Sequence, residues 1–172
     1  MRLEGDAWRA FFDSYQRSAF RLETLPVYAM PDEEDEFRRF LAGERPPADL
    51  HYSWLDRVAR FRETGRIIQR VHIVTRPLSD YLRYEFEWAY AFNVRAGEDI
   101  RILDLTDRED PGVPDEDFWM FDEEKVVRMM YRPDGSQIGR ELLDAPEIER
   151  YIAYRDAALA DAVPFEEYWQ GH

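Results

Sequence analysis

The stretch that decides the fold is IIQRVHIVTRPLSDYLRYEFEWAYAFNVRAGEDIRILDL, residues 67–105. Residues 67–75 are rich in β-branched side chains, which is typical of a buried strand. Apolar side chains then recur at helical intervals over 78–90, and Ser79 is placed to cap this helix. Residues 100–105 are again strand-like. The stretch therefore predicts a strand–helix–strand crossover between two parallel strands, and with it an α/β fold.

Downstream of the crossover, three short segments predict an antiparallel meander: 118–121, 126–131 and 136–143. The sequence RPDG at 132–135 marks a hairpin turn, because proline pre-sets one turn position and glycine accepts a positive φ. Asp144 follows the meander and is expected to cap a C-terminal helix.

Upstream of the crossover, the chain predicts helices and one extended segment. Residues 6–17 carry aromatic side chains three and four apart, which places one aromatic stripe on a helix, and 18–28 alternate as a short strand does. Proline and a run of carboxylates at 31–36 are typical of a helix start. The loop 44–51, with its adjacent prolines, is the best linker, and Ser53 is expected to cap the next helix.

The length of 172 residues fits a single domain, 1–172. The linker would divide a helical N-terminal subregion, 1–45, from a mixed α/β core, 52–172. The fold class is therefore expected to be α/β, with α+β open as the alternative.

The composition excludes several classes of function. Lys and Arg supply 23 charges against 37 from Asp and Glu, and the net charge of −14 disfavours direct binding to nucleic acid. The absence of cysteine excludes disulfides, thiolate zinc sites and cysteine nucleophiles. No apolar run approaches the ~18 residues of a membrane span, and the first residues have no apolar leader pattern. A cytoplasmic protein without membrane contact or cofactor is expected.

Few residues suit catalysis. The histidines are His51, His72 and the C-terminal His172, and their scattered positions disfavour a three-histidine metal site. No metal and no catalytic residue are predicted. His72 lies within the strand predicted over 70–74, near an end where functional groups often sit. A packed or edge-strand histidine is the favoured alternative, because no nucleophile or base neighbours it in the sequence. Arg76 and Ser79 lie where a strand gives way to a helix and could hold an anion, with ordinary capping and an internal salt bridge as the alternative.

Two further features concern buried polar groups. Arg21 and Glu23 fall on the same face of the segment 18–28 and are expected to form a buried polar element. Glu85 and Glu87 lie among aromatic residues, so at least one of these carboxylates is expected near apolar surface.

The order strand, RPLS, helix, strand and meander resembles a half-domain of the phospholipase D type. Enzymes of that type use a histidine nucleophile followed by a lysine and an aspartate. From His72, the matching positions hold Val74 and Ser79 instead. Because phosphoryl transfer needs a cation to stabilise the developing charge, the resemblance implies a degenerate site.

Four stretches that cover most of the chain are similar to an actinobacterial family of unknown function, typically encoded beside helix-turn-helix regulators. They are FFDSYQRSAFRLETLPVY (11–28), RVHIVTRPLSDYLRYEFEWAYAFNVRAGEDIRILDL (70–105), DFWMFDEEKVVRMMYRPDGSQIGRELL (117–143) and YRDAALADAVPFEEYW (154–169). The resemblance implies a helix-turn-helix regulator as partner and the recurrence of Arg21, Glu23, Arg76, Tyr81, Gly97, Glu98, Asp117, Trp119 and Asp122. It supplies no catalytic residue.

These observations predict a non-catalytic regulatory or binding protein that acts with a helix-turn-helix regulator or a small ligand. The alternative is a phosphodiesterase-type hydrolase with a degenerate phospholipase-D-like site near His72, Arg76 and Asp104. The candidate ligand-binding residues are Arg76, Ser79, His72, Tyr81, Arg21, Glu23 and Trp119. Because 26 aromatic residues (11 Phe, 10 Tyr and 5 Trp) are many for one small core, a homodimer is also expected.

Overall fold

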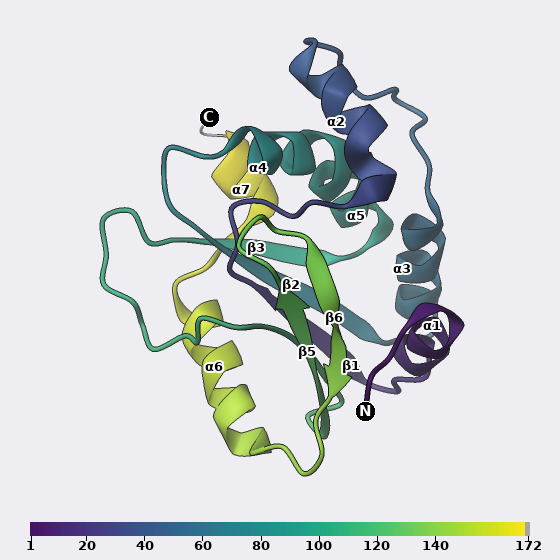
Figure 1. Cartoon of the computed structure of the whole chain (residues 1–172), viewed down its shortest axis with the longest axis vertical. Helices are drawn as coiled ribbons and strands as arrows, with labels where there is room; N and C mark the ends of the chain where they lie inside the picture. Colours follow the sequence, from purple (N-terminus) through teal and green to yellow (C-terminus); the bar gives the residue numbers. More distant parts are fainter. Residues whose placement is uncertain (171–172) are drawn as a thin grey trace.

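The structure, a computed structural model, describes residues 1–170 and contains a mixed sheet of seven strands in the order β6-β5-β4-β1-β2-β3-β7 (Figure 1). The strands β1, β2 and β3 run parallel, and each of the others pairs antiparallel with its neighbour. The predicted α/β class is confirmed. The strands are β1 (Ser18–Glu23), β2 (Ile67–Val74), β3 (Asp99–Asp104), β4 (Asp117–Phe121), β5 (Lys125–Tyr131), β6 (Gln137–Leu142) and β7 (Val163–Pro164).

Helices cover both faces of the sheet. α6 packs on one face, while α1, α3, α7 and the helical segment α4–η2–α5 pack on the other. None of the helices within residues 1–170 has the length and apolar content needed to cross a membrane. The helical elements are α1 (Gly5–Asp13), η1 (Pro31–Glu33), α2 (Glu34–Leu41), α3 (Ser53–Glu63), α4 (Asp80–Glu85), η2 (Phe86–Tyr90), α5 (Ala91–Ala96), α6 (Ile148–Ala160) and α7 (Phe165–Gln170).

The crossover between β2 and β3 is confirmed, because these two strands pair in parallel over Gln69 to Val74. Ser79 caps the intervening helix, since its Oγ accepts the amide of Leu82 at 3.1 Å. The helix is not regular throughout: η2 is a π-helical turn, which the sequence did not predict. Such turns are frequent at functional sites, and this one carries Tyr90 into the polar network described below.

The predicted meander is confirmed as β4, β5 and β6, but two details differ from expectation. The C-terminal helix α6 begins at Ile148, with Glu147 at the N-cap, and Asp144 does not cap it. The chain turns at Ala145, which has a positive φ of 46°, so the helix cannot start directly after Asp144. The two residues of β7, which extend the sheet beyond β3, were also not predicted.

The face of the sheet under α1 and α3 is built from aromatic side chains. Phe12 of α1 packs against Trp119 and Phe121 of β4, and Phe61 of α3 stacks on Phe12 in the same cluster. The aromatic stripe of α1 is therefore covered by the sheet of its own chain. The predicted homodimer stays a prediction.

The central strand of the sheet is β1, which pairs with β2 on one side and β4 on the other. β1 belongs to the expected 1–45 subregion, whereas both of its partners belong to 52–172. Residues on both sides of the predicted linker therefore contribute to one sheet.

Asp122 fixes the start of β1. Its carboxylate accepts the amides of Gln16 (2.9 Å), Arg17 (2.6 Å) and Ser18 (3.0 Å). Burial alone would raise the pKa of Asp122, but these three amides and the charge of Arg17 lower it overall.

We expect Asp122→Asn to lower the free energy of unfolding at pH 7 by about 1–2 kcal/mol, because the carboxylate accepts charge-assisted hydrogen bonds. Asparagine tolerates the φ of 55° at this position, so backbone strain does not confound the result. A lowered pKa stabilises the folded state above the unfolded-state pKa, and this stability is lost as the pH falls. Urea unfolding should therefore show the difference vanishing in acid. Glu124→Gln, at an exposed neighbour, should change little, and an equal effect of both substitutions would contradict this role.

Candidate functional site

Charged residues interrupt the apolar face of the sheet at its centre. Arg21 and Glu23 of β1, Arg70 and His72 of β2, and Asp117 of β4 share the face that bears Ile68 and Trp119, because side chains alternate along each strand. Arg21, Glu23, His72 and Asp117 are buried, and only 14% of the Arg70 side chain is exposed. The buried polar element expected at Arg21 and Glu23 is confirmed, and it is larger than the sequence indicated.

One half of this polar network is centred on Asp117. Its Oδ2 pairs with Arg21 Nη2 at 3.0 Å and accepts a hydrogen bond from Tyr28 OH, while its Oδ1 accepts from the amide and hydroxyl of Thr24. Arg21 also donates to Tyr131 OH at 3.0 Å. The Nε of Arg21 is buried without a hydrogen-bond partner among the described residues.

The other half is centred on Arg70, which joins two carboxylates. Its guanidinium contacts Glu23 Oε1 and lies 2.7 Å from Glu98 Oε2. Tyr90 OH donates to Glu23 Oε1 at 3.1 Å, and Trp54 Nε1 donates to Glu98 at 2.8 Å. Burial opposes ionisation of Glu23, but the charges of Arg70 and Arg21 outweigh burial and hold the pKa of Glu23 at about 2.

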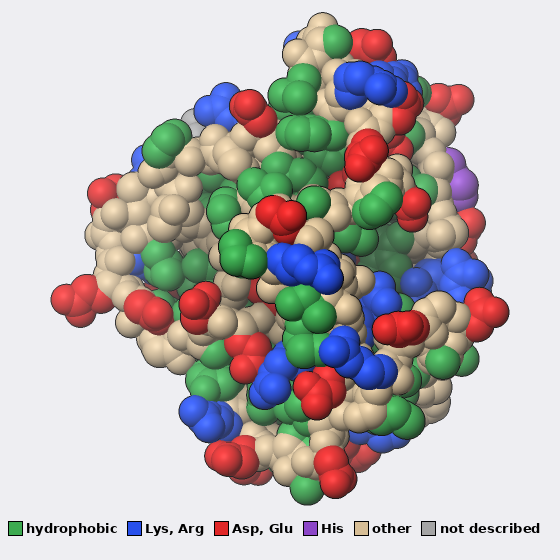
Figure 2. All heavy atoms as spheres, in the orientation of Figure 1, with side chains coloured by type: hydrophobic (Ala, Val, Ile, Leu, Met, Phe, Trp, Pro, Cys, Tyr) green, Lys and Arg blue, Asp and Glu red, His purple; other side chains and the backbone are tan. Residues whose placement is uncertain are grey.

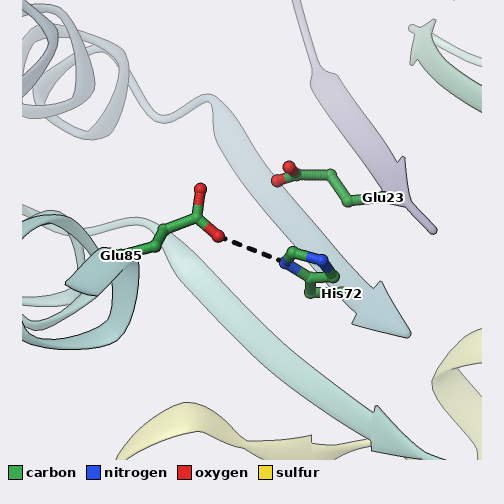
Figure 3. Close-up of side chains that lie close together, drawn as sticks. All are labelled: Glu23, His72 and Glu85. Carbon is green, nitrogen blue, oxygen red and sulfur yellow. Dashed lines mark ion pairs between the residues drawn. The ribbon is translucent and has the colours of Figure 1, made fainter. Parts of the chain in front are cut away.

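His72 is fully buried beside these groups (Figure 3). Its Nε2 lies 2.8 Å from the carbonyl oxygen of Leu25, and its Nδ1 lies 2.8 Å from Tyr90 OH and 3.3 Å from Glu85 Oε1. Burial lowers the pKa of His72, but the interaction with Glu85 and the charge of Glu23 more than compensate, so the pKa is raised overall. The sequence identified Glu85 only as a carboxylate near apolar surface and did not indicate that it faces His72.

A cavity of about 300 Å³ opens over this network, which is near the lower end of the range for small-molecule sites. In Figure 2 a hollow with hydrophobic side chains in its depth and basic side chains beside it lies between β6 and α3. The cavity is lined by Trp8, Phe12, Arg21, Glu23, Tyr28, Met30, Glu33, Trp54, Arg57, Arg70, Tyr81, Glu85, Trp119, Met129, Tyr131, Gln137 and Arg140.

The seven candidate residues divide into two sets. Arg21, Glu23, Tyr81 and Trp119 line the cavity, and His72 contacts the lining residue Glu85. Arg76 and Ser79 do not line it.

Arg76 pairs with Asp104 at 2.9 Å and with Asp107 at 3.1 Å, while Ser79 caps α4 and donates to the carbonyl of Pro26 at 2.6 Å. These contacts are the salt bridge and the cap that the sequence allowed as the alternative to an anion site.

Arg140 lines the cavity and was not singled out by the sequence analysis. Its positive charge is the least balanced by carboxylates among the arginines of the cavity. Arg21, Arg57 and Arg70 each pair with a carboxylate, whereas the Arg140 guanidinium has no ion pair within residues 1–170, and its Nε is buried without a hydrogen-bond partner. It stacks over Trp8 at 5.2 Å from the ring centroid. Nothing in the local sequence QIGREL (137–142) marks Arg140 as a cavity residue.

A family model, described as a domain of unknown function (DUF6879), matches residues 6–170. The chain belongs to this family. No curated protein and no solved structure matches the chain. Every residue that lines the cavity falls within the matched range, so the cavity lies inside the DUF6879 domain.

Glu33, at the rim of the DUF6879 cavity, provides a pH-dependent test of this geometry. Its Oε2 accepts from Tyr81 OH at 3.0 Å. Burial, reinforced by the charges of Glu85, Glu23 and Glu36, raises the pKa of Glu33 from 4.5 to about 7 despite the hydrogen bond from Tyr81.

A raised carboxyl pKa stabilises the folded state below pH 4.5, and this stability is lost as the pH rises to about 7. In the wild type, the free energy of unfolding should therefore fall by at most about 3 kcal/mol between pH 4.5 and about 7. We expect Glu33→Gln to remove this fall. Urea unfolding from pH 4.5 to 7.5 measures it, with the exposed Glu34→Gln as control. A wild-type profile already flat over this range would contradict the raised pKa of Glu33.

Proposed function

We propose that this DUF6879 protein is a non-catalytic regulatory protein that binds a small planar organic anion in the cavity and acts with a helix-turn-helix regulator. The proposed ligand is inferred from Arg140, whose half-buried guanidinium has no ion pair within residues 1–170. The cavity has aromatic walls, which are provided by Trp8, Trp54 and Trp119. Aromatic walls with a few convergent polar or charged groups are typical of sites for small organic molecules.

The proposed partner follows from the resemblance to an actinobacterial family encoded beside helix-turn-helix regulators. The net charge of −14 supports this pairing, because an acidic surface accelerates the encounter with a basic DNA-reading face. The absence of cysteine fits a reducing compartment, and the cytoplasm is the proposed location.

The ligand is tested with benzoate and indole-3-acetate, each compared with its neutral amide, by isothermal titration calorimetry. A carboxylate that pairs with Arg140 should bind at least about 10-fold more tightly than its amide, and Arg140→Gln should abolish that preference. Arg132→Gln, in the exposed turn between β5 and β6, is the control. Equal binding of acids and amides, or an unchanged preference in Arg140→Gln, would refute the anion site.

The partner is tested by co-purification, at low and high salt, with the helix-turn-helix regulator encoded beside this protein. An electrostatically assisted complex should form at low salt and weaken as the salt concentration rises. Absence of the complex at every salt concentration would exclude this partner.

The hydrolase alternative requires His72 to attack a phosphodiester. Both ring nitrogens of His72 already have partners, and the side chain is fully buried. The alternative remains testable: a phosphodiesterase screen of the wild type against His72→Ala should show a loss of orders of magnitude if the histidine is the nucleophile.

A further inference from the structure

Three side chains of types that can ligate a metal ion converge below the cavity from three separate elements. Glu23 ends β1, His72 lies opposite it in the register of β2, and Glu85 ends α4. Figure 3 shows the Glu85 carboxylate pointing at the His72 ring, with the Glu23 carboxylate on the neighbouring strand. One ligand atom from each residue lies within 4.8 Å of the other two, and all three residues are buried.

The hydrogen bonds around His72 select its tautomer. The carbonyl oxygen of Leu25, 2.8 Å from Nε2, only accepts hydrogen bonds, so Nε2 carries a proton. Nδ1, which lies 2.8 Å from Tyr90 OH, is therefore the nitrogen that a metal ion would bind, and an ion there would displace this contact. Histidine ligands in metal sites typically donate their other ring nitrogen to a carbonyl or carboxylate in this way.

One carboxylate oxygen of Glu85 receives no hydrogen bond from the described part of the chain. Its Oε1 is buried without a hydrogen-bond donor and lies 3.3 Å from His72 Nδ1. When Nδ1 carries no proton, two lone pairs face each other at this distance, which is unfavourable unless a cation lies between them.

The buried charges also leave a deficit of positive charge. Arg21 is balanced by Asp117, and Arg70 pairs with both Glu23 and Glu98. Within residues 1–170, the ion pair of Glu85 is with His72 and not with an arginine. Three carboxylates against one guanidinium leave a net charge of −2 when His72 is neutral. A proton on His72 cancels half of this charge, and a divalent cation cancels all of it.

We propose that Glu23, His72 and Glu85 bind one divalent transition-metal ion, with Nδ1 and one oxygen of each carboxylate as ligands. One imidazole and two carboxylates suit Zn²⁺, Co²⁺ or Mn²⁺ better than Ca²⁺, which prefers oxygen ligands alone. Glu23 and Glu85 line the cavity, so the remaining coordination positions face it and are open to water or a ligand. Arg70 and Tyr90 hold the Glu23 carboxylate in place.

The full-length chain, freed of metal by dialysis against a chelator, is titrated with Zn²⁺ by calorimetry and with Co²⁺ by visible absorption. One ion per chain is expected, with a Co²⁺ spectrum of nitrogen and oxygen ligands. Glu85→Gln keeps the shape of the side chain and should weaken binding at least about 100-fold. Glu87→Gln, two residues away and outside the cluster, is the matched control and should bind as the wild type does.

Absence of a saturable Zn²⁺ or Co²⁺ site, or unchanged affinity in Glu85→Gln, would overturn the metal site. His72→Gln provides a second variant, with circular dichroism to confirm folding. If it does not fold, Glu85→Gln alone decides. The metal site does not depend on the proposed organic ligand. If the protein binds Zn²⁺ but shows no preference for carboxylates over amides, only the proposed function is refuted. If it shows that preference but binds no Zn²⁺, only the metal site is refuted.

Discussion

Replacement of Arg70 with leucine is expected to lower the free energy of unfolding by about 3–5 kcal/mol. The substitution removes the one guanidinium that pairs with both Glu23 and Glu98, whose side chains are 4% and 0% exposed. Two carboxylates would remain in a site from which water is largely excluded, and each would lack its charged partner. Urea unfolding at pH 7, monitored by tryptophan fluorescence and circular dichroism, measures the loss.

Arg83→Leu is the matched control for Arg70→Leu, because it removes the same charge from an exposed position on α4. Its expected effect is within about 0.5 kcal/mol. A loss below 1 kcal/mol for Arg70→Leu would show that water reaches Glu23 and Glu98 and that the network is not a buried one.

Phe12→Ala is expected to cost a comparable 3–5 kcal/mol, for a different reason. Phe12 is 1% exposed, and six aromatic rings surround it, the closest being Trp119 at 4.7 Å between centroids. Removal of the ring leaves a hole between α1 and the sheet and removes part of the cavity wall.

Phe11→Ala tests whether this effect is specific to the buried ring. Phe11 is the next residue of α1 and is only partly buried, so a loss of about 1–2 kcal/mol is expected. Equal losses for the two substitutions in chemical denaturation would show that α1 does not insert Phe12 into the core.

Much of the fold could be predicted because its signals are local. The β-branched run before Pro77, the cap at Ser79 and the hairpin turn at 132–135 each depend on residues close in sequence, and the structure contains all three features. The start of α6 was misplaced because the positive φ of Ala145 leaves no trace in the residue type.

The site was predictable only in part, because its contacts join distant segments. Alternation placed Arg21 and Glu23 on one face, but their partners Asp117 and Arg70 come from strands whose neighbours depend on the sheet order. Arg140 faces the cavity only because β6 lies two strands beyond β4. No spacing within the sequence encodes that relation.

The central position of β1 also bears on how the chain folds during synthesis. β1 leaves the ribosome early, yet its partner β2 begins at Ile67 and its other partner β4 begins only at Asp117. Long-range pairing of this kind slows folding, because a large loop must close before the pairing stabilises it. The nascent segment that carries Arg21 and Glu23 therefore waits until Asp117 has been translated, and a chaperone that shields it is expected to raise the yield of native protein.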